Sequence, residues 1–153
     1  WSYDVVDLGY NYRLDEIRAA LGSVQLSKLD TYNAQRRELV KVYIEMLSEL
    51  VPSVAIPFQN HPGISACHLM PILLPEKTDR KKIMDSMKKE GIQTSIHYPP
   101  VHQFKAYDYL EKSQSALSLT EMIAQRELTL PLFPAMSIAD VEMVVSVVKK
   151  TLL

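Results

Sequence analysis

Two helical stripes occupy the first third of the chain. Apolar residues recur every three or four positions over residues 14–29, a period that predicts a helix. A second stripe of the same period predicts a helix over residues 31–50, with Asp30 or Thr31 as its cap and Pro52 as its stop. Because only a residue or two separates the two stripes, we expect the helices to be nearly continuous or sharply bent.

Residues 67–74 form a short apolar run between turn-forming residues, which predicts a strand. Pro71 inside this run indicates an edge position or a bulge, because proline cannot donate a ladder hydrogen bond. Farther along, Thr78 or Asp79 begins a helical stripe that ends at Gly91. A glycine followed by an apolar residue is typical of a helix that ends in the left-handed conformation.

Two more short strands are expected in the second half, at residues 93–98 and 127–133. Between them we expect a loop with short helical pieces over residues 101–112, and then a helix over residues 116–125.

Ser137 and Asp140 form a capping-box-like pattern ahead of valines at helical spacing, so a final helix should begin there. In total, about three strands alternate with helices. This order predicts an α/β fold (α+β-like), in which a short antiparallel or mixed sheet is packed with helices.

Composition excludes several classes of protein. The 153 residues suit one domain, and 47% are hydrophobic against 23% charged. The formal net charge of −1, from 17 basic and 18 acidic residues, predicts neither nucleic-acid binding nor a polybasic membrane patch. No segment reaches the roughly 20 apolar residues that span a bilayer, and the first residues do not resemble a signal peptide. We therefore expect a cytoplasmic protein.

The start of the chain and its cysteine carry two smaller expectations. The chain begins with Trp1, in a stretch typical of the middle of a protein, so we expect it to be a piece of a larger one. Cys67 is the one cysteine, can form no disulfide within the chain, and is expected to act as a small apolar side chain.

The densest polar signal is the segment GYNYR at residues 9–13, directly before the first helix. Asn11 could cap that helix or bind a ligand. Arg13 is unfavourable beside the positive end of the helix dipole, which suggests that another group needs its charge. Tyr10 could stack on a ligand or contribute an interface aromatic. These residues form a candidate ligand-binding segment.

The chain has four histidines, and none makes a metal-binding pair on a helix. His97 and His102 flank two prolines that could hold them in place, but no third ligand accompanies them. No glycine-rich phosphate loop and no nucleophile elbow occur. We therefore predict no metal site.

Three segments, in this order, resemble the DegT/DnrJ/EryC1/StrS family of aminotransferases, which depend on pyridoxal 5'-phosphate (PLP) and act on nucleotide-linked keto sugars. They are GYNYRLDEIRAALG at residues 9–22, GIQTSIHYPPVH at residues 91–102 and LTLPLFP at residues 128–134. The resemblance implies a fold-type-I transferase. Residues 1–30 would form an interdomain and dimer segment, and residues 31–153 the small C-terminal α/β domain.

The resemblance also implies roles for individual residues. Asn11 matches the asparagine that reaches the PLP phosphate across the dimer interface, and Arg13 matches an arginine that holds a carboxylate of the glutamate donor. His97 and His102 match a segment that lies near the sugar-nucleotide pocket, and Tyr10 is a candidate substrate-binding residue. The alternatives are a helix cap for Asn11, a surface or interface ion pair for Arg13, a satisfied strand histidine for His97 and a solvated loop residue for His102.

The resemblance places the cofactor lysine in a domain N-terminal to these residues, and no segment here resembles its surroundings. The lysines at positions 28, 41, 81 and 82 are typical of solvated helix faces. We therefore expect no catalytic residue in this chain, no activity of the chain alone and no retention of PLP by it.

Three functions remain open. The parent protein could be an aminotransferase that moves an amino group from glutamate to a nucleotide-linked keto sugar, as a homodimer. It could instead be a PLP- or PMP-dependent sugar dehydratase of the same family, in which the lysine is replaced. A non-catalytic dimerisation or regulatory domain is the third possibility.

Overall fold

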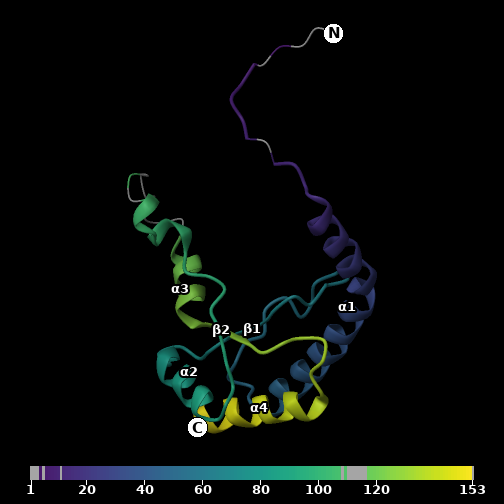
Figure 1. The fold of residues 1–153 in the computed structure, drawn as a ribbon. Helices are drawn as coiled ribbons and strands as arrows, with labels where there is room; N and C mark the ends of the chain where they lie inside the picture. Colours follow the sequence, from purple (N-terminus) through teal and green to yellow (C-terminus); the bar gives the residue numbers. More distant parts are fainter. Residues whose placement is uncertain (1–3, 5, 11, 108, 110–116, 153) are drawn as a thin grey trace. The chain divides into compact units, whose positions relative to one another are not determined.

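The computed structural model describes residues 4, 6–10, 12–107, 109 and 117–152. The chain divides into two compact units, Trp1–Thr31 and Tyr32–Leu153, which are described separately. The elements, labelled in Figure 1, are α1 (Glu16–Leu50), β1 (Met70–Leu73), α2 (Arg80–Lys89), the 3-10 turns Val101–Gln103 and Lys105–Tyr107, α3 (Ser118–Arg126), β2 (Glu127–Leu130) and α4 (Ile138–Leu152).

The first two predicted helices are one helix, α1, so the expected break at Asp30 and Thr31 is wrong. Neither proline nor glycine occurs near these residues, and polar side chains alone do not interrupt a helix. The cap lies at Asp15, whose carboxylate accepts a hydrogen bond of 2.9 Å from the backbone N–H of Arg18. The helix ends at Leu50, ahead of Pro52 as predicted.

The boundaries of α2 confirm the capping signals in the sequence. Asp79 is the cap, and its carboxylate accepts from the backbone N–H of Lys82. Gly91 has a φ of 78°, and the N–H of Ile92 donates to the carbonyl of Met87 over 2.9 Å. Ile92 is buried, so its side chain anchors the left-handed end of the helix in the core.

β1 and β2 pair antiparallel, with Met70 opposite Leu130 and Ile72 opposite Leu128 on the face that meets the core. Proline is tolerated at position 71 of β1 because the N–H that it lacks would point away from β2. Leu73, two residues on, exchanges both backbone bonds with Ala55 on that same side. The prediction of an edge position is therefore confirmed.

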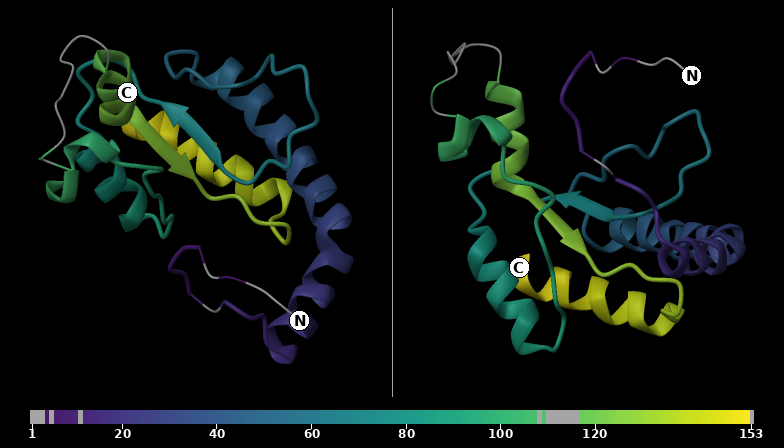
Figure 2. Two further views of the ribbon diagram at one scale, coloured as in Figure 1. Left: turned by 90° about the horizontal axis from the view of Figure 1, so that it is seen from above. Right: turned by 45° about the horizontal axis from the view of Figure 1, so that its top comes forward.

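The core of the second unit joins this sheet to three helices. α1 contributes residues from its second half, and α2 and α4 contribute one face each. In Figures 1 and 2 the two strands lie side by side, with α4 packed across them. The residues that are most fully buried are Tyr43, Leu47, Met70, Ile72, Leu74, Met87, Leu128, Leu130, Val141, Val145 and Val148.

The third predicted strand, residues 93–98, is reduced to a single bridge between Ser95 and Thr129, so that prediction is wrong. The next ladder bond would join the N–H of His97 to the carbonyl of Glu127. That carbonyl instead accepts from the guanidinium of Arg80, at 3.0 Å, and the N–H of His97 donates to the Glu127 carboxylate, at 2.9 Å. The ladder therefore stops after one pair.

Other parts of the second half agree with the sequence more closely. The 3-10 turns confirm the short helical pieces expected after residue 100, while residues 108 and 110–112 of that prediction lie outside the described part. α3 and β2 confirm the predicted helix and strand, although β2 ends before Pro131. None of the helices in the described part of the chain combines the length and the apolar content that a membrane span requires.

The capping box at the start of α4 is confirmed. The backbone N–H of Asp140 donates to the hydroxyl of Ser137 over 3.2 Å, and the Asp140 carboxylate accepts from the N–H and the hydroxyl of Ser137 over 2.8 Å each. Because α4 carries five buried valines, this cap holds the start of a helix on which the core depends.

Replacing the capping hydroxyl should destabilise the protein. We expect Ser137→Ala to lower the free energy of unfolding by about 1 kcal/mol, the usual cost of losing such a cap. Urea unfolding followed by circular dichroism measures it. Ser146→Ala, at an exposed position in the middle of the same helix, is the control and should cause no loss. Equal effects of the two variants would contradict the capping role.

Tyr43 generates a second prediction, on alkaline stability. Its hydroxyl is buried and donates to the carbonyl of Pro131 over 2.9 Å. Burial raises the pKa of Tyr43 well above its ordinary value of 10.0, and the charge of Asp140 adds to this effect. An unfolded tyrosine ionises near the ordinary value. Unfolding therefore releases a proton above that pH, and stability falls as the pH rises towards the raised pKa.

Tyr43→Phe should cost about 1 kcal/mol at neutral pH through the lost hydrogen bond. Above about pH 10 the difference from wild type should shrink, because the variant lacks the group that ionises on unfolding. Urea titrations at several pH values measure this difference. The exposed Tyr109→Phe is the control and should show neither effect. A constant difference across the pH range would contradict the assignment.

Candidate functional site

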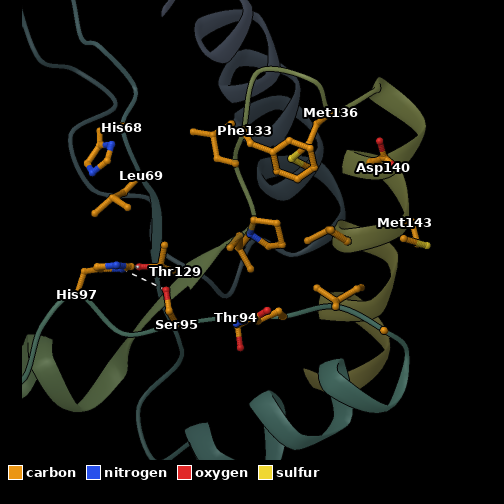
Figure 3. A pocket seen from close by; sticks show the side chains of 17 residues that line it. His68, Leu69, Thr94, Ser95, His97, Thr129, Phe133, Met136, Asp140 and Met143 are labelled. Carbon is orange, nitrogen blue, oxygen red and sulfur yellow. Dashed lines mark hydrogen bonds between the residues drawn. The ribbon is translucent and has the colours of Figure 1, made fainter. Parts of the chain in front are cut away.

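A cavity of about 550 Å³ opens in the second unit beside the end of β2 (Figure 3). Its walls come from the segment after β2, the segment after α2, the first turns of α4 and the chain just before β1. The lining residues are His68, Leu69, Gly91, Ile92, Gln93, Thr94, Ser95, His97, Thr129, Leu130, Pro131, Leu132, Phe133, Met136, Asp140, Met143 and Val144.

One end of this cavity is polar because of strand register. Ser95 and Thr129 exchange backbone hydrogen bonds of 3.1 and 2.9 Å, so their side chains project from the same face. Glu127 lies two residues before Thr129 in β2, so its side chain shares that face. His97 lies beyond the end of the ladder, and its N–H donates to the Glu127 carboxylate. The antiparallel alignment therefore brings four polar side chains together.

These side chains form a chain of hydrogen bonds. Nδ1 of His97 lies 2.9 Å from the hydroxyl of Thr129 and 3.3 Å from that of Ser95 (Figure 3). The hydroxyl of Thr129 donates to one carboxylate oxygen of Glu127, and the N–H of His97 donates to the other. Glu127 is only 6% exposed and Thr129 only 4%, so two buried polar groups satisfy each other.

The opposite end of the cavity is apolar. Phe133, Met136, Met143 and Val144 line it, and Asp140 lies beside them (Figure 3). Hydrogen bonds from the backbone N–H and then from the hydroxyl of Ser137 hold the pKa of Asp140 below its ordinary value, so this carboxylate serves the helix cap. A cavity with one apolar end and a few convergent polar groups suits a small organic ligand.

His102 belongs to a different contact. Its Nε2 lies 2.8 Å from a carboxylate oxygen of Glu121 in α3, and its side chain is 20% exposed. This pair ties the 3-10 turn Val101–Gln103 to the first turn of α3. His102 is not one of the residues that line the cavity, so the structure separates the two histidines of the HYPPVH segment.

The first unit carries the other predicted site residues. Tyr10 and Tyr12 are 86% and 87% exposed, with their ring centroids 5.7 Å apart. Arg13 is exposed and has no ion pair with any described residue. Asn11 lies outside the described residues. Across the described part of the chain, no three metal-binding side chains gather in one place.

Glu127 and Thr129 were missed by the sequence-based prediction of site residues. Their signal was present: a charged residue begins an otherwise apolar strand, and a hydroxyl follows two positions later on the same face. An acidic residue in a buried strand requires a hydrogen-bonding partner. Because side chains along a strand alternate between the two faces of the sheet, the position of the acid indicates on which face that partner lies.

Known proteins share this architecture. The chain is 35% identical to the dTDP-3-amino-3,6-dideoxy-alpha-D-galactopyranose transaminase of Aneurinibacillus thermoaerophilus, over 97% of this chain and 39% of the relative. Helicobacter pylori PseC, an aminotransferase involved in the biosynthesis of pseudoaminic acid, matches with a TM-score of 0.86 and 30% identity, over 97% of this chain and 40% of that chain.

DesV of S. venezuelae, solved in complex with a ketimine intermediate, matches with a TM-score of 0.84 and 28% identity, over 98% of this chain and 40% of that chain. The chain thus spans about 40% of the length of the relatives it matches. These similarities confirm the predicted fold, a small α/β domain of a fold-type-I transferase with a short antiparallel sheet.

The resemblance seen in the three sequence segments extends along nearly the whole chain, since residues 1–149 match a single family. The fold and the similar proteins agree with that match. The chain therefore belongs to the DegT/DnrJ/EryC1/StrS aminotransferase family.

Proposed function

We propose that this chain is part of a PLP-dependent aminotransferase that transfers an amino group from glutamate to a nucleotide-linked keto sugar. The family match over residues 1–149 is the observation that carries the proposal. The similarity to a dTDP-amino-sugar transaminase and to PseC supports a sugar as the amino acceptor. The cofactor lysine would lie in the part of the protein that precedes these residues.

The residues of this chain suit PLP only in part. The cofactor, when bound, would supply the electron sink for amino transfer. Its phosphate does not suit the cavity of the second unit, because none of the described residues that line the cavity is a lysine or an arginine. The GYNYR segment fits better. The amide of Asn11 would donate to a phosphate oxygen, and the exposed guanidinium of Arg13 would hold a carboxylate of glutamate.

The sugar nucleotide would be bound by the remaining predicted residues. His97 presents a ring to a cavity with polar and apolar ends, which suits a deoxy sugar that carries both hydroxyl and methyl groups. Tyr10 would offer an exposed ring for stacking. His102, held by Glu121, would act at the edge of the site.

The active assembly would be a homodimer in which residues 1–30 reach the cofactor of the partner subunit. This arrangement would give the exposed apolar side chains of α1, among them Ile17, Leu21 and Val24, a protein surface to cover them. The residues after position 30 would form the small domain on the sugar side of the site.

The role of Asn11 can be tested in the full-length protein. Asn11→Ala should weaken PLP binding about tenfold or more, the effect of losing a hydrogen bond to a charged group. Dialysis followed by the absorbance of bound PLP measures retention. Asn60→Ala, at an exposed loop position, is the control and should retain PLP as wild type does. Unchanged retention by the Asn11 variant would contradict the phosphate-binding role, and capping would not replace it, because Asp15 caps α1.

The chain by itself should not catalyse transamination. The lysines that the structure describes are exposed, and Lys41 and Lys82 form exposed ion pairs within their own helix or with its cap, so none of these is placed as a Schiff-base residue. Glutamate and a nucleotide-linked keto sugar, incubated with the purified 153-residue chain, should give no amino sugar by mass spectrometry. Turnover by this chain would overturn the assignment.

The same preparation of full-length protein separates the alternatives. A yellow protein that converts glutamate to 2-oxoglutarate supports the aminotransferase. A cofactor-bound protein that eliminates water from the sugar without using glutamate is the dehydratase. A colourless protein that dimerises supports the non-catalytic domain.

A further inference from the structure

We propose that Glu127 and Thr129 are positioning residues that hold His97 as its Nδ1–H tautomer, so that Nε2 is a hydrogen-bond acceptor for a hydroxyl group of the bound sugar. The identity of the ligand rests on the proposed function. The arrangement of protons does not, since it follows from hydrogen bonds within the second unit.

The Glu127 carboxylate sets the direction of donation along this series of hydrogen bonds. One of its oxygens accepts the backbone N–H of His97, which can only donate. The other accepts the hydroxyl of Thr129. A threonine hydroxyl has one hydrogen, so the oxygen of Thr129 has only lone pairs left for other partners.

This constraint decides the tautomer of His97. Nδ1 lies 2.9 Å from the Thr129 oxygen, and two lone pairs facing each other would repel. Nδ1 must therefore carry the hydrogen and donate it. The hydroxyl of Ser95, 3.3 Å from the same nitrogen, can also accept from it. In the neutral ring, Nε2 is then left with a free lone pair.

Nε2 is also accessible. It forms no hydrogen bond with any described residue. Every buried side-chain nitrogen or oxygen in the described part has a hydrogen-bond partner, so a nitrogen without one is not fully buried. Nε2 therefore remains in contact with solvent, in a side chain that is half-buried and lines the cavity. Its natural partner is a neutral donor, and the hydroxyls of a sugar supply such groups.

Glu127 and Thr129 orient the ring together: the carboxylate fixes the hydrogen of the Thr129 hydroxyl, and the oxygen of that hydroxyl accepts from Nδ1 of His97. The pattern is that of a histidine oriented by an acid through one intervening hydroxyl. A residue of this kind acts through His97 and does not touch the ligand.

The test is nitrogen-15 NMR of the His97 ring in the 153-residue chain, with neither cofactor nor sugar. At about pH 8, where histidine is largely neutral, His97 should show a protonated Nδ1 and an unprotonated Nε2. A protonated Nε2 in the wild-type neutral ring would overturn the proposal directly.

Glu127→Gln gives a sharper outcome because it should reverse the direction of donation along the hydrogen bonds that join residue 127, Thr129 and His97. The amide oxygen must face the N–H of His97, so the amide NH₂ donates to Thr129. The Thr129 hydroxyl is then free to donate to Nδ1, and the hydrogen of His97 moves to Nε2. We expect the ratio of the Nδ1–H to the Nε2–H tautomer to fall by about twofold to tenfold, the range that corresponds to one net hydrogen bond. An unchanged ratio would exclude Glu127 from this role.

Variants at Thr129 distinguish positioning from packing. Thr129→Ser keeps the hydroxyl and should keep the Nδ1–H tautomer, whereas Thr129→Val keeps the shape and should lose the preference. Thr94→Val, a cavity threonine with no bond to His97, is the matched control and should leave the ratio unchanged (Figure 3). Should the valine variant fail to fold, the serine and Glu127→Gln variants decide the outcome.

Diethyl pyrocarbonate, which acylates unprotonated imidazole nitrogen, probes the accessibility of Nε2. Peptide mass spectrometry should find His97 acylated in wild type, and about twofold to tenfold more slowly in Glu127→Gln. If wild-type His97 were not acylated, the proposal that its Nε2 is an accessible acceptor would be wrong. These measurements need no PLP, so a negative result would contradict the tautomer assignment without contradicting the proposed function. Conversely, a full-length protein that binds no PLP would contradict the proposed function without contradicting the tautomer assignment.

Discussion

The carboxylate of Glu127 connects the fold of the second unit to its candidate site. Its two oxygens take the hydroxyl of Thr129 and the N–H of His97, while its backbone carbonyl takes the guanidinium of Arg80. Its own N–H closes the last turn of α3. A buried charge is tolerated only with such complete hydrogen bonding. One residue thus ends a helix, begins β2 and stops a third strand from forming.

The interrupted ladder leaves the N–H of His97 to the Glu127 carboxylate at the polar end of the cavity. Had residues 93–98 continued as a strand, their backbone groups would pair with β2, and His97 would be one more side chain on a sheet face. Instead the segment leaves β2 after the bridge of Ser95 with Thr129, and the ring of His97 turns towards the hydroxyls. The apolar end, near Phe133 and Met143, then completes a pocket with two different ends.

The two units contribute different kinds of chemistry. The first presents exposed tyrosines and an arginine on a short segment ahead of α1, and that segment is the one expected to meet cofactor and glutamate. The second is a packed domain with a cavity whose described lining contains neither lysine nor arginine and suits a neutral, hydroxyl-bearing group. In the proposed enzyme, charge recognition and sugar recognition would therefore lie on separate parts of the chain.

Local signals in the sequence determined most helices, both caps of α2, the capping box of α4 and the edge position of Pro71, because each depends on residues a few positions apart. The three motifs also determined the family. Only the tertiary structure decided that α1 is unbroken, that residues 93–98 do not form a strand, and that Glu127 and Thr129 meet His97. Those outcomes depend on which distant group receives each hydrogen bond, and local patterns carry no information about that choice.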